Sequence, residues 1–468
     1  MSSRWNPRPR PQRLQLAERR AFESGPVQYR RLFASSRVPD EPADRLVVAP
    51  AGSSKDAVVF RDGHAYLLPL LDAGGDPVPV AAIEAALFAI EADADARGTN
   101  PRPLSVLSTL PRDEWARHHA ATREADTTNA ATLTAIEGAL FGITLDRLAP
   151  ETDASFCRAA HEGGDGKSLW YDKSFSLLVY ANGRAAIHCE HAHFDAPIVA
   201  RMGAYVSRLV SELEARDGSG GATSAPTPSA ETCQPLRWRR ADFTRLPAAV
   251  EAAIDAAPAR FGDLISSNRL APIRFTGGGR RALLKLKGAS TDSVMQMSFQ
   301  LAHARDQGAL VPTYESATTR RFHRGRTETI RSLSAAAAAF VALMGDPAAS
   351  RERKATALIA ALREHGDWLL ACSSGHGVDR HLMGLRISAA MSGMPTPSIF
   401  ADDAYTRSST YNLSTSNTST PGVGAEYFTM GGFGAPLIDC YGISYQARGS
   451  HLSPLTSHPH PRCVSSTL

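Results

Sequence analysis

The stretch Ser174–His191, SFSLLVYANGRAAIHCEH, decides the fold of the first half of this chain. It consists of two strand-like apolar runs on either side of Asn182-Gly183. Asn-Gly is the strongest short signal for a two-residue β-hairpin turn. His191 then falls where the second strand ends and the chain leaves the sheet. Because loops at strand ends often carry functional groups, His191 and its neighbours are the first candidates for a site.

Strand and helix signals alternate on both sides of this hairpin. Earlier in the chain, RLVVAP and AVVFRDGHAYLLPLL predict strands, with Asp62-Gly63 as a hairpin turn, and AAIEAALFAIEADADA predicts a helix. In the second half, AAVEAAIDAAPARFGDLI, DSVMQMSFQLAHARD and SLSAAAAAFVALMG predict helices, the last of them a core helix. TYNLSTSN and YGISYQ then predict strands. This alternation indicates an α/β or α+β fold, of which we expect the α/β class.

A segment poor in apolar residues divides the chain. Residues 219–235, SGGATSAPTPSAETCQP, predict a linker or a long surface loop. We therefore expect one domain over residues 1–218 and a second over residues 236–446. The remaining residues, 447–468, are polar and proline-rich without periodicity, and predict a disordered tail.

Composition excludes several classes of protein. The chain has 468 residues, a net charge of +4 and six cysteines without a CxxC pair. The small charge gives no argument for a nucleic-acid partner, and scattered cysteines favour a reducing compartment over a disulfide framework. No apolar run approaches the ~18 residues that a membrane span needs. The arginine-rich N-terminus resembles a transit peptide and equally well a basic helix of the fold.

The histidines around the strand end admit three interpretations. In IHCEHAHFDAP, residues 187–197, a metal site would use His188, Cys189, His191 and His193, but no second ligand pair appears elsewhere in the sequence. The side chains could equally be ordinary polar groups at a strand end. Thirdly, Asp195, four residues after His191, could hold its imidazole in one tautomer, so that His191 acts as a general base.

Ordered sequence blocks favour the third interpretation. LWYDKSFSLLVYANGRAAIHCEHAHFD resembles the carnitine/choline acyltransferase pattern W-[FY]-D-K-S-[FL], a hairpin, then E-H-[SA]-x-x-[DE]. Four further blocks follow in the family's order, and an earlier one precedes them. They are residues 313–332, 379–386, 413–417 and 431–445, preceded by QYRRLFASSRVP at 28–39. The resemblance implies two chloramphenicol-acetyltransferase-like α/β domains with an active-site tunnel at their interface.

The resemblance also implies a reaction and its catalytic residues. His191 would take the proton from the carnitine hydroxyl, which attacks the acyl-CoA thioester directly, and Asp195 would orient His191. The sequence lacks a G-x-S-x-G nucleophile elbow, which agrees with direct attack. Ser416, the last residue of Ser-Thr-Ser, would donate a hydrogen bond to the oxyanion. A hydroxyl-rich loop is the alternative for that segment, because Ser and Thr crowd residues 408–420.

Substrate contacts are implied in the same way. The carnitine carboxylate would bind Tyr314, Ser316, Thr327 and Arg380; choline-specific members lack this threonine and this arginine, so carnitine is favoured. CoA would contact Arg281, Lys285 and Asp292, although one family lysine is arginine here and another falls on Gly288. A solvated basic helix face is the alternative for that segment. Gly431 would leave the acyl tunnel open, as in medium- and long-chain members.

We therefore expect a carnitine O-acyltransferase that moves medium- or long-chain acyl groups reversibly between CoA and carnitine. Acyl-CoA and carnitine are its expected partners, CoA is a substrate and not a bound cofactor, and no metal or nucleic acid is expected. Most similar are the palmitoyl-transferring members of the mitochondrial inner membrane, which implies a mitochondrial location, with peroxisome or cytoplasm as alternatives, and leaves peripheral membrane contact open. Because the family extends beyond both ends of this chain, a truncated member that binds without turnover is the alternative function, followed by a metal-binding protein.

Overall fold

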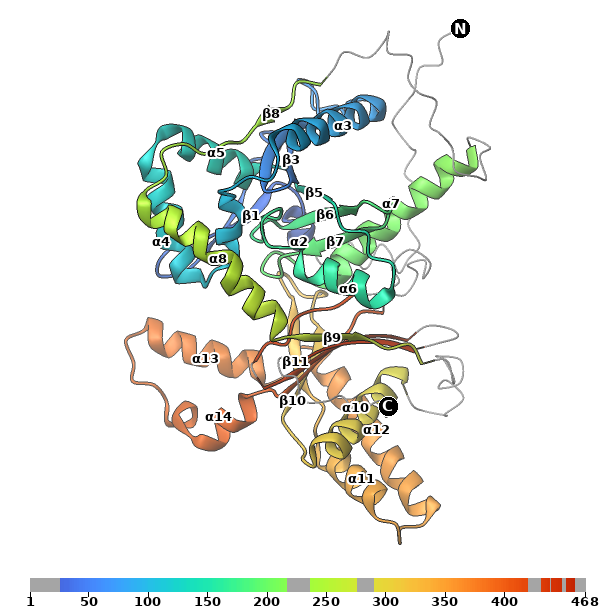
Figure 1. Ribbon diagram of the computed structural model, residues 1–468. Coiled ribbons are helices and arrows are strands. Elements are labelled where there is room, and N and C mark those ends of the chain that lie inside the picture. The colour runs from blue at the N-terminus through green and yellow to red at the C-terminus, as the bar shows by residue number, and fades with distance from the viewer. Residues whose placement is uncertain are drawn as a thin grey trace.

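The computed structural model consists of two six-stranded sheets with helices packed on them (Figure 1). It describes residues 26–216, 236–275, 290–419, 431–437, 439–447 and 452–458. A short antiparallel ribbon joins β1 (Ser35–Val38) to β2 (Arg45–Val48) near the start of the described chain. The expected α/β class is confirmed at this level.

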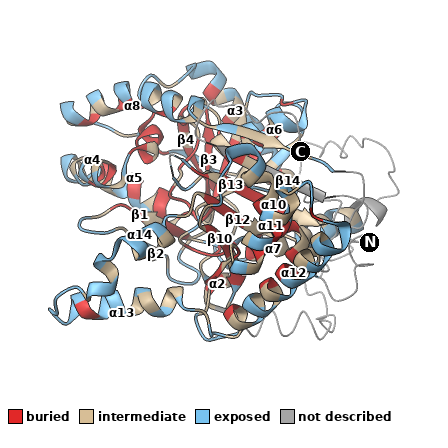
Figure 2. Cartoon of the chain, turned by 90° about the horizontal axis from the view of Figure 1, so that it is seen from below, coloured by how far each residue is buried: buried red, intermediate tan, exposed pale blue. Residues whose placement is uncertain are grey.

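The first sheet is mixed. Its strands lie in the order β7 (Ala185–Cys189), β6 (Phe175–Tyr180), β5 (Gly142–Asp146), β3 (Asp56–Arg61), β4 (His64–Pro69) and β8 (Arg239–Arg240). The accompanying helical elements are α2 (Pro26–Arg30), α3 (Val80–Arg97), η1 (Leu104–Thr109), α4 (Arg112–Ala125), α5 (Thr127–Gly138), α6 (Asp153–Glu162), α7 (Ala196–Arg216) and α8 (Ala248–Ser266). Buried residues concentrate in the strands and on the helix faces against them (Figure 2).

Both predicted hairpin turns are present in this sheet. β6 pairs with β7 across Asn182-Gly183, and β3 pairs with β4 across Asp62-Gly63. Gly183 has a φ of 78°, a left-handed conformation that glycine adopts without the clash of a Cβ atom. The turn therefore sets the register of β7 and delivers His191 to the edge of the sheet.

The second sheet has the strand order β11 (Thr327–Arg331), β10 (Thr313–Thr318), β12 (Leu413–Asn417), β13 (Tyr441–Ala447), β14 (Leu452–His458) and β9 (Arg269–Pro272). Its helical elements are α10 (Thr291–Gln307), α11 (Ala335–Gly345), α12 (Arg351–Ser373), α13 (Asp379–Met391), η2 (Ser398–Ala401) and α14 (Asp403–Ser409). Met297 of α10, Phe340 of α11 and Leu362 of α12 pack into one core cluster, while α13 and α14 project to one side (Figure 1).

The predicted boundary between the two domains, at 219–235, comes earlier in the chain than the point at which the chain leaves the first packed unit. The expected linker, 219–235, falls entirely outside the described residues, and the segment after it still belongs with the first sheet. β8 pairs with β4, and Val250 and Ile254 of α8 lie in the same apolar cluster as Trp115. The chain first enters the second sheet at β9, because the apolar face of α8 is buried against helices of the first half.

The predicted disordered tail is wrong for one segment. Residues 452–458 form β14, which pairs antiparallel with both β13 and β9. The sequence signal failed because LSPLTSH is short and polar, and its neighbours in the sheet supply the hydrogen bonds that fix it. Residues 459–468 lie outside the described residues. Among the described helices, none is both long and apolar enough to cross a membrane.

Candidate active site

His191 lies in the turn directly after β7 and is exposed. It lines a pocket of about 650 Å³ together with residues of the β1–β2 ribbon and of α4. Most other side chains around this pocket are charged: Arg37, Asp40, Asp44, Arg112, Asp113 and Glu190. His191 is therefore accessible to a small polar ligand.

Asp195 does not contact His191 directly in the described hydrogen bonds. Arg326 lies between them: its Nη2 is 2.8 Å from Asp195 Oδ1 and 3.2 Å from His191 Nδ1. The same nitrogen donates to the His191 carbonyl oxygen at 2.7 Å. The predicted His191–Asp195 pair is therefore replaced by a bridge through an arginine from the other half of the chain.

This bridge fixes the tautomer of His191. A guanidinium only donates hydrogen bonds, so Nδ1 must accept, and a neutral ring then carries its proton on Nε2. For Nε2 to act as a base, the Arg326–Nδ1 contact has to be exchanged for one in which Nδ1 carries the hydrogen.

Gln28 is a second partner of Asp195 that the sequence reasoning missed. Its Nε2 donates to Asp195 Oδ2 at 2.9 Å, and its Oε1 accepts from the Asp195 backbone N–H at 2.8 Å. Both residues are buried. Gln28 and Arg326 both lie inside blocks that carry the family resemblance, which was the available signal.

The neighbouring histidines and cysteine are not arranged as a metal site. Burial, followed by nearby positive charge, lowers the pKa of His193 to about 4, and its Nδ1 lies 3.2 Å from Ser35 Oγ. Burial likewise lowers the pKa of His188 to about 4 and raises that of Cys189 to about 12. Among the described residues, the one group with metal-binding geometry lies elsewhere.

The four predicted carnitine residues come together at the β10–β11 edge of the second sheet. Arg380 of α13 points its Nη2 at Tyr314 OH, 3.4 Å away, and at Thr327 Oγ1, 3.3 Å away. Ser316 Oγ donates to Tyr314 OH at 3.3 Å. A guanidinium framed by hydroxyl groups suits a carboxylate.

Ser416 lies on β12, next to the strand that carries Tyr314. Tyr314 is in register with Ser414, and Glu315 with Thr415. Because side chains alternate along a strand, Tyr314, Ser316, Ser414 and Ser416 share one face of the sheet. Thr415 points to the other face and donates to the Tyr314 carbonyl oxygen at 2.9 Å.

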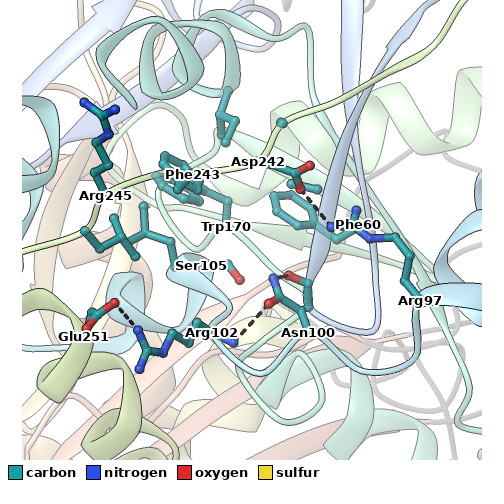
Figure 3. A pocket seen from close by; sticks show the side chains of 16 residues that line it. Phe60, Arg97, Asn100, Arg102, Ser105, Trp170, Asp242, Phe243, Arg245 and Glu251 are labelled. Atoms are coloured by element: carbon teal, nitrogen blue, oxygen red, sulfur yellow. Dashed lines mark hydrogen bonds and ion pairs between the residues drawn. The ribbon is translucent and has the colours of Figure 1, made fainter. Parts of the chain in front are cut away.

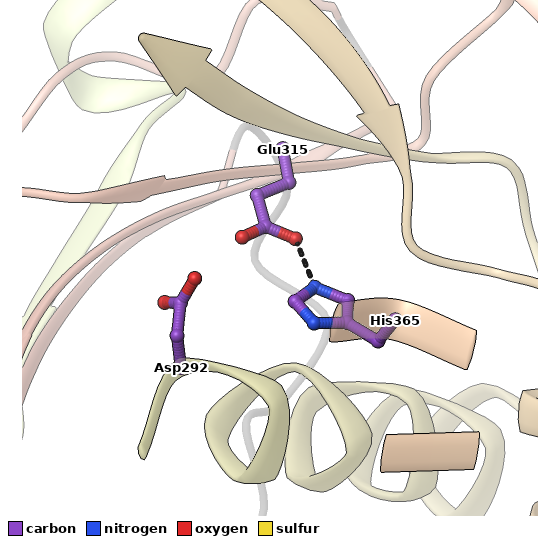
Figure 4. Close-up of side chains that lie close together, drawn as sticks. All are labelled: Asp292, Glu315 and His365. Atoms are coloured by element: carbon purple, nitrogen blue, oxygen red, sulfur yellow. Dashed lines mark hydrogen bonds and ion pairs between the residues drawn. The ribbon is translucent and has the colours of Figure 1, made fainter. Parts of the chain in front are cut away.

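Asp292 occupies a different environment from a surface phosphate site. It lies in the first turn of α10, and its Oδ1 accepts from Asn417 Nδ2 at 2.7 Å and from Tyr445 OH at 2.5 Å. The buried side chains of Glu315 and His365 lie beside it (Figure 4), and His365 Nε2 is 2.6 Å from Glu315 Oε2. Burial raises the pKa of Glu315 to about 7. No local pattern in the sequence predicted this pair.

The remaining predicted contacts are less informative. Arg281 and Lys285 lie outside the described residues. Gly431 is exposed, and a Cβ atom added there would meet nothing within 4 Å. The described surroundings of Gly431 therefore contain no wall of an acyl tunnel.

Comparisons with solved structures give only distant similarity. A wax ester synthase/diacylglycerol acyltransferase from Marinobacter aquaeolei VT8 matches with a TM-score of 0.30 and 11% identity, covering 68% of this chain and 74% of the other. A structure described as CT matches with a TM-score of 0.30 and 10% identity, covering 69% and 70%. TM-scores this low do not establish a common fold, so the chloramphenicol-acetyltransferase-like fold stays a prediction.

Sequence relatives are much closer. Carnitine O-palmitoyltransferase 2, mitochondrial, from Mus musculus is 34% identical over 421 residues, which cover 89% of this chain and 61% of the relative. The enzyme of the same name from Bos taurus is 34% identical over 428 residues, 90% of this chain and 61% of the relative. Peroxisomal carnitine O-octanoyltransferase from Mus musculus is 28% identical and is covered to 68%. The chain thus spans about three fifths of the length of the palmitoyltransferases.

A family model described as Choline/Carnitine o-acyltransferase matches residues 12–466. The match includes most of residues 447–468, for which we predicted a disordered tail, and it runs through both sheets. The chain therefore belongs to the choline/carnitine O-acyltransferase family.

Proposed function

We propose that this chain transfers medium- or long-chain acyl groups reversibly between CoA and carnitine. The observation that carries the proposal is the convergence of Tyr314, Thr327 and Arg380 at the β11 edge of the second sheet, with Arg326, adjacent to Thr327 in the chain, donating to the His191 carbonyl oxygen. The peptide bond between Arg326 and Thr327 therefore links a residue proposed to bind the carboxylate to the arginine that contacts His191.

Charge around His191 supports a cationic substrate. The pocket beside it carries four carboxylates but only two guanidiniums, those of Arg37 and Arg112. Burial opposes ionisation of Asp44, but hydrogen bonds from Arg112 and Arg37 outweigh it and lower the pKa of that carboxyl. The excess of negative charge favours a quaternary ammonium group, and the Arg380 cluster favours a carboxylate, so a zwitterion such as carnitine suits both.

The reaction needs one proton acceptor and one oxyanion donor. His191 takes the proton of the carnitine hydroxyl as the oxygen attacks the thioester carbonyl carbon. Ser416 donates a hydrogen bond to the carbonyl oxygen as it gains charge. The carbon–sulfur bond then breaks, and the imidazolium returns the proton to the CoA thiolate. Asp195 and Arg326 act as positioning residues for His191.

The CoA and acyl contacts are part of the same proposal. Arg281 and Lys285 are proposed to bind CoA, and Gly431 to leave room for a longer acyl chain; Asp292 is instead held by Asn417 and Tyr445. The names of the relatives support palmitoyl or octanoyl groups and a mitochondrial or peroxisomal location.

Thiol release from acetyl-, octanoyl- and palmitoyl-CoA, with carnitine or choline as acceptor, tests the proposal. We expect carnitine-dependent release from the longer thioesters, reduced about 10²–10⁴-fold in His191→Ala. His323→Ala, an exposed histidine of the β10–β11 loop, is the matched control and should retain activity. Release that survives His191→Ala would overturn the assignment of the base.

A family member that binds substrates without turnover is the second candidate. It is favoured by the contact between Arg326 and His191 Nδ1, which leaves a neutral ring without a free basic nitrogen. Binding of carnitine measured by calorimetry, together with no release from any thioester, would select this candidate.

A further inference from the structure

Glu328 of β11 is a buried carboxylate that the proposed reaction does not use. Its residue is 5% exposed, and charged side chains with so little exposure usually face an opposite charge. Even partly exposed charges do so at the pocket beside β3 and β4, where Arg97 Nη2 lies 3.3 Å from Asp242 Oδ1 (Figure 3). Within the described part of the chain, Glu328 has no ion pair, and its oxygens accept from backbone N–H groups instead.

The donors to this carboxylate are the N–H groups of Thr329 and Arg380. Glu328 Oε1 accepts from the Thr329 N–H at 2.8 Å and from the Arg380 N–H at 3.2 Å, and Oε2 lies 3.4 Å from the same Arg380 nitrogen. Arg380 is the second residue of α13, whose N-cap residue, Val378, has no capping side chain. Glu328 therefore caps this helix from a neighbouring strand, where its negative charge suits the positive end of the helix dipole.

Two consecutive residues of β11 hold Arg380 at both its backbone and its side chain. The Thr327 carbonyl oxygen accepts from Arg380 Nε at 3.1 Å, and Thr327 Oγ1 lies 3.3 Å from Arg380 Nη2. Glu328, the next residue, holds the Arg380 N–H. The direction in which the guanidinium points, toward Tyr314, is therefore fixed by contacts at both of its ends.

Apolar packing contributes little to the position of α13. Among the residues of this helix, all of which are described, only Ala389 is buried. Its larger apolar side chains are exposed, namely Met383, Leu385, Ile387 and Met391. The other polar contact at its start is the ion pair of Asp379 with Arg331 of β11, at 2.7 Å. The location of Arg380 therefore depends on the polar contacts that the first turn of α13 makes with β11.

Gly377, just before α13, leaves the space that the Glu328 side chain occupies. A Cβ atom at Gly377 would overlap Glu328 Cγ and would lie 2.9 Å from its Oε2. An alanine there would push the carboxylate away from the Arg380 N–H. Gly377→Ala is therefore a second way to break the contact without changing Glu328 itself.

We propose that Glu328 is a positioning residue for the carboxylate of the acceptor, which acts by holding the backbone of Arg380. This inference rests on the proposed function. Without Glu328, the Arg380 N–H loses its acceptor and the guanidinium loses one of the two contacts that fix its direction. An acceptor that has no carboxylate, such as choline, gains nothing from Arg380, so its use should not depend on Glu328.

Calorimetric titration of the full chain with 4-(trimethylammonio)butanoate measures this recognition apart from turnover, because the probe has the charges of carnitine but lacks its hydroxyl. Glu328→Ala should weaken binding about tenfold, the usual effect of losing one charge-assisted hydrogen bond. Glu328→Gln should weaken it only about threefold, because a neutral amide oxygen still accepts, though less strongly. Glu352→Ala, which removes an exposed glutamate from the first turn of α12, is the matched control and should bind as the wild type does.

Thiol release from octanoyl-CoA distinguishes positioning from a general loss of structure. Glu328→Ala should raise the KM for carnitine about tenfold and leave the KM for octanoyl-CoA unchanged, the pattern of a lost binding contact to one substrate. Gly377→Ala should show the same pattern, and both variants should keep the circular dichroism spectrum of the wild type.

The outcomes separate this inference from the proposed function. Wild-type affinity for the probe in either folded Glu328 variant, or an equal rise of both KM values, would overturn the inference and leave the proposed function intact. If Glu328→Ala does not fold, Glu328→Gln decides the matter. A wild type that binds the probe but releases no thiol still tests Glu328 by calorimetry, whereas a wild type that does not bind the probe overturns both proposals.

Discussion

At the scale of single residues, Arg326 carries the arrangement around His191. Asp195 is buried, with its side chain 8% exposed, and Arg326 is its charge partner. Arg326→Ala leaves this carboxylate unpaired, so we expect a loss of about 1–3 kcal/mol in the free energy of unfolding. Transfer activity should fall by at least about tenfold, because the backbone carbonyl of His191 loses the hydrogen bond from Arg326 that positions the residue. Chemical denaturation and thiol release measure the two effects.

Arg324→Ala is the matched control for Arg326→Ala. Arg324 is an exposed arginine two positions earlier in the β10–β11 loop. Equal losses in both variants would mean that the basic loop as a whole, and not the Asp195 contact, is responsible.

His193 predicts a specific pH dependence of stability. Burial, followed by the charge of Lys173, lowers its pKa to about 4 from the ordinary histidine value of 6.5. Below pH 6.5 the unfolded chain therefore takes up a proton that the folded chain refuses, so the contribution of His193 to stability falls as the pH drops toward 4. The full effect is about 3 kcal/mol, at about 1.4 kcal/mol per pKa unit.

Thermal unfolding of His193→Gln and the wild type between pH 7 and pH 4 measures this effect. Burial raises the pKa values of Asp172 and Glu315 to about 6 and about 7. Their contribution to stability therefore rises as the pH falls, which is opposite to the effect of His193. They are present in both proteins, so the difference between the two proteins isolates His193. The variant should gain stability relative to the wild type as the pH falls; a constant difference would contradict a neutral buried imidazole.

At the scale of elements, the β6–β7 turn determines the position of His191 at the end of β7. Gly183 has a φ of 78°, and a Cβ atom there would meet nothing within 4 Å, so only backbone strain opposes a substitution. Gly183→Ala should cost about 1–2 kcal/mol in the free energy of unfolding. Gly138→Ala, in the last turn of α5 and equally free of contacts, should be neutral or stabilising. Denaturant titration of both variants distinguishes conformational strain from a general loss at glycine positions.

Local patterns predicted the elements better than the contacts between them. The two hairpins and the helices α3, α8, α10 and α11 follow from turn residues and helical spacing, which are properties of neighbouring residues. The His191–Asp195 pair was predicted from a spacing of four, but Arg326, 131 positions from Asp195, lies between them. No short window of sequence contains that competitor.

Domain limits failed for a related reason. The segment 219–235 has the composition of a linker, but composition does not determine which core the next helix joins. α8 carries Val250, Ile254 and Ala257 at helical spacing, and these side chains are buried in the first half. The residues predicted to bind carnitine, in contrast, lie close together, as the resemblance implied, because the resemblance names positions and not only local patterns.

At the scale of the whole molecule, β14 completes the second sheet. It pairs with β13 on one side and β9 on the other, so β9 reaches the sheet only through β14. A chain ending after residue 451 should lose the cooperative unfolding of this half, whereas one ending after His458 retains every described strand. Thermal melts of the two truncated chains test this; identical melting curves would show that β14 contributes nothing to stability.

The Arg326 bridge has a consequence for fidelity. As long as the guanidinium donates to Nδ1, a neutral His191 has no nitrogen that is both unprotonated and free, so a water molecule in the pocket finds no acceptor for its proton there. Under the proposed function, an acyl-CoA that arrives before carnitine is then protected from hydrolysis. Because Thr327 follows Arg326 directly, a carboxylate bound at Thr327 is well placed to shift the bridge and release the base. Acyl-CoA would then react only after carnitine is bound, and its loss to hydrolysis would be suppressed.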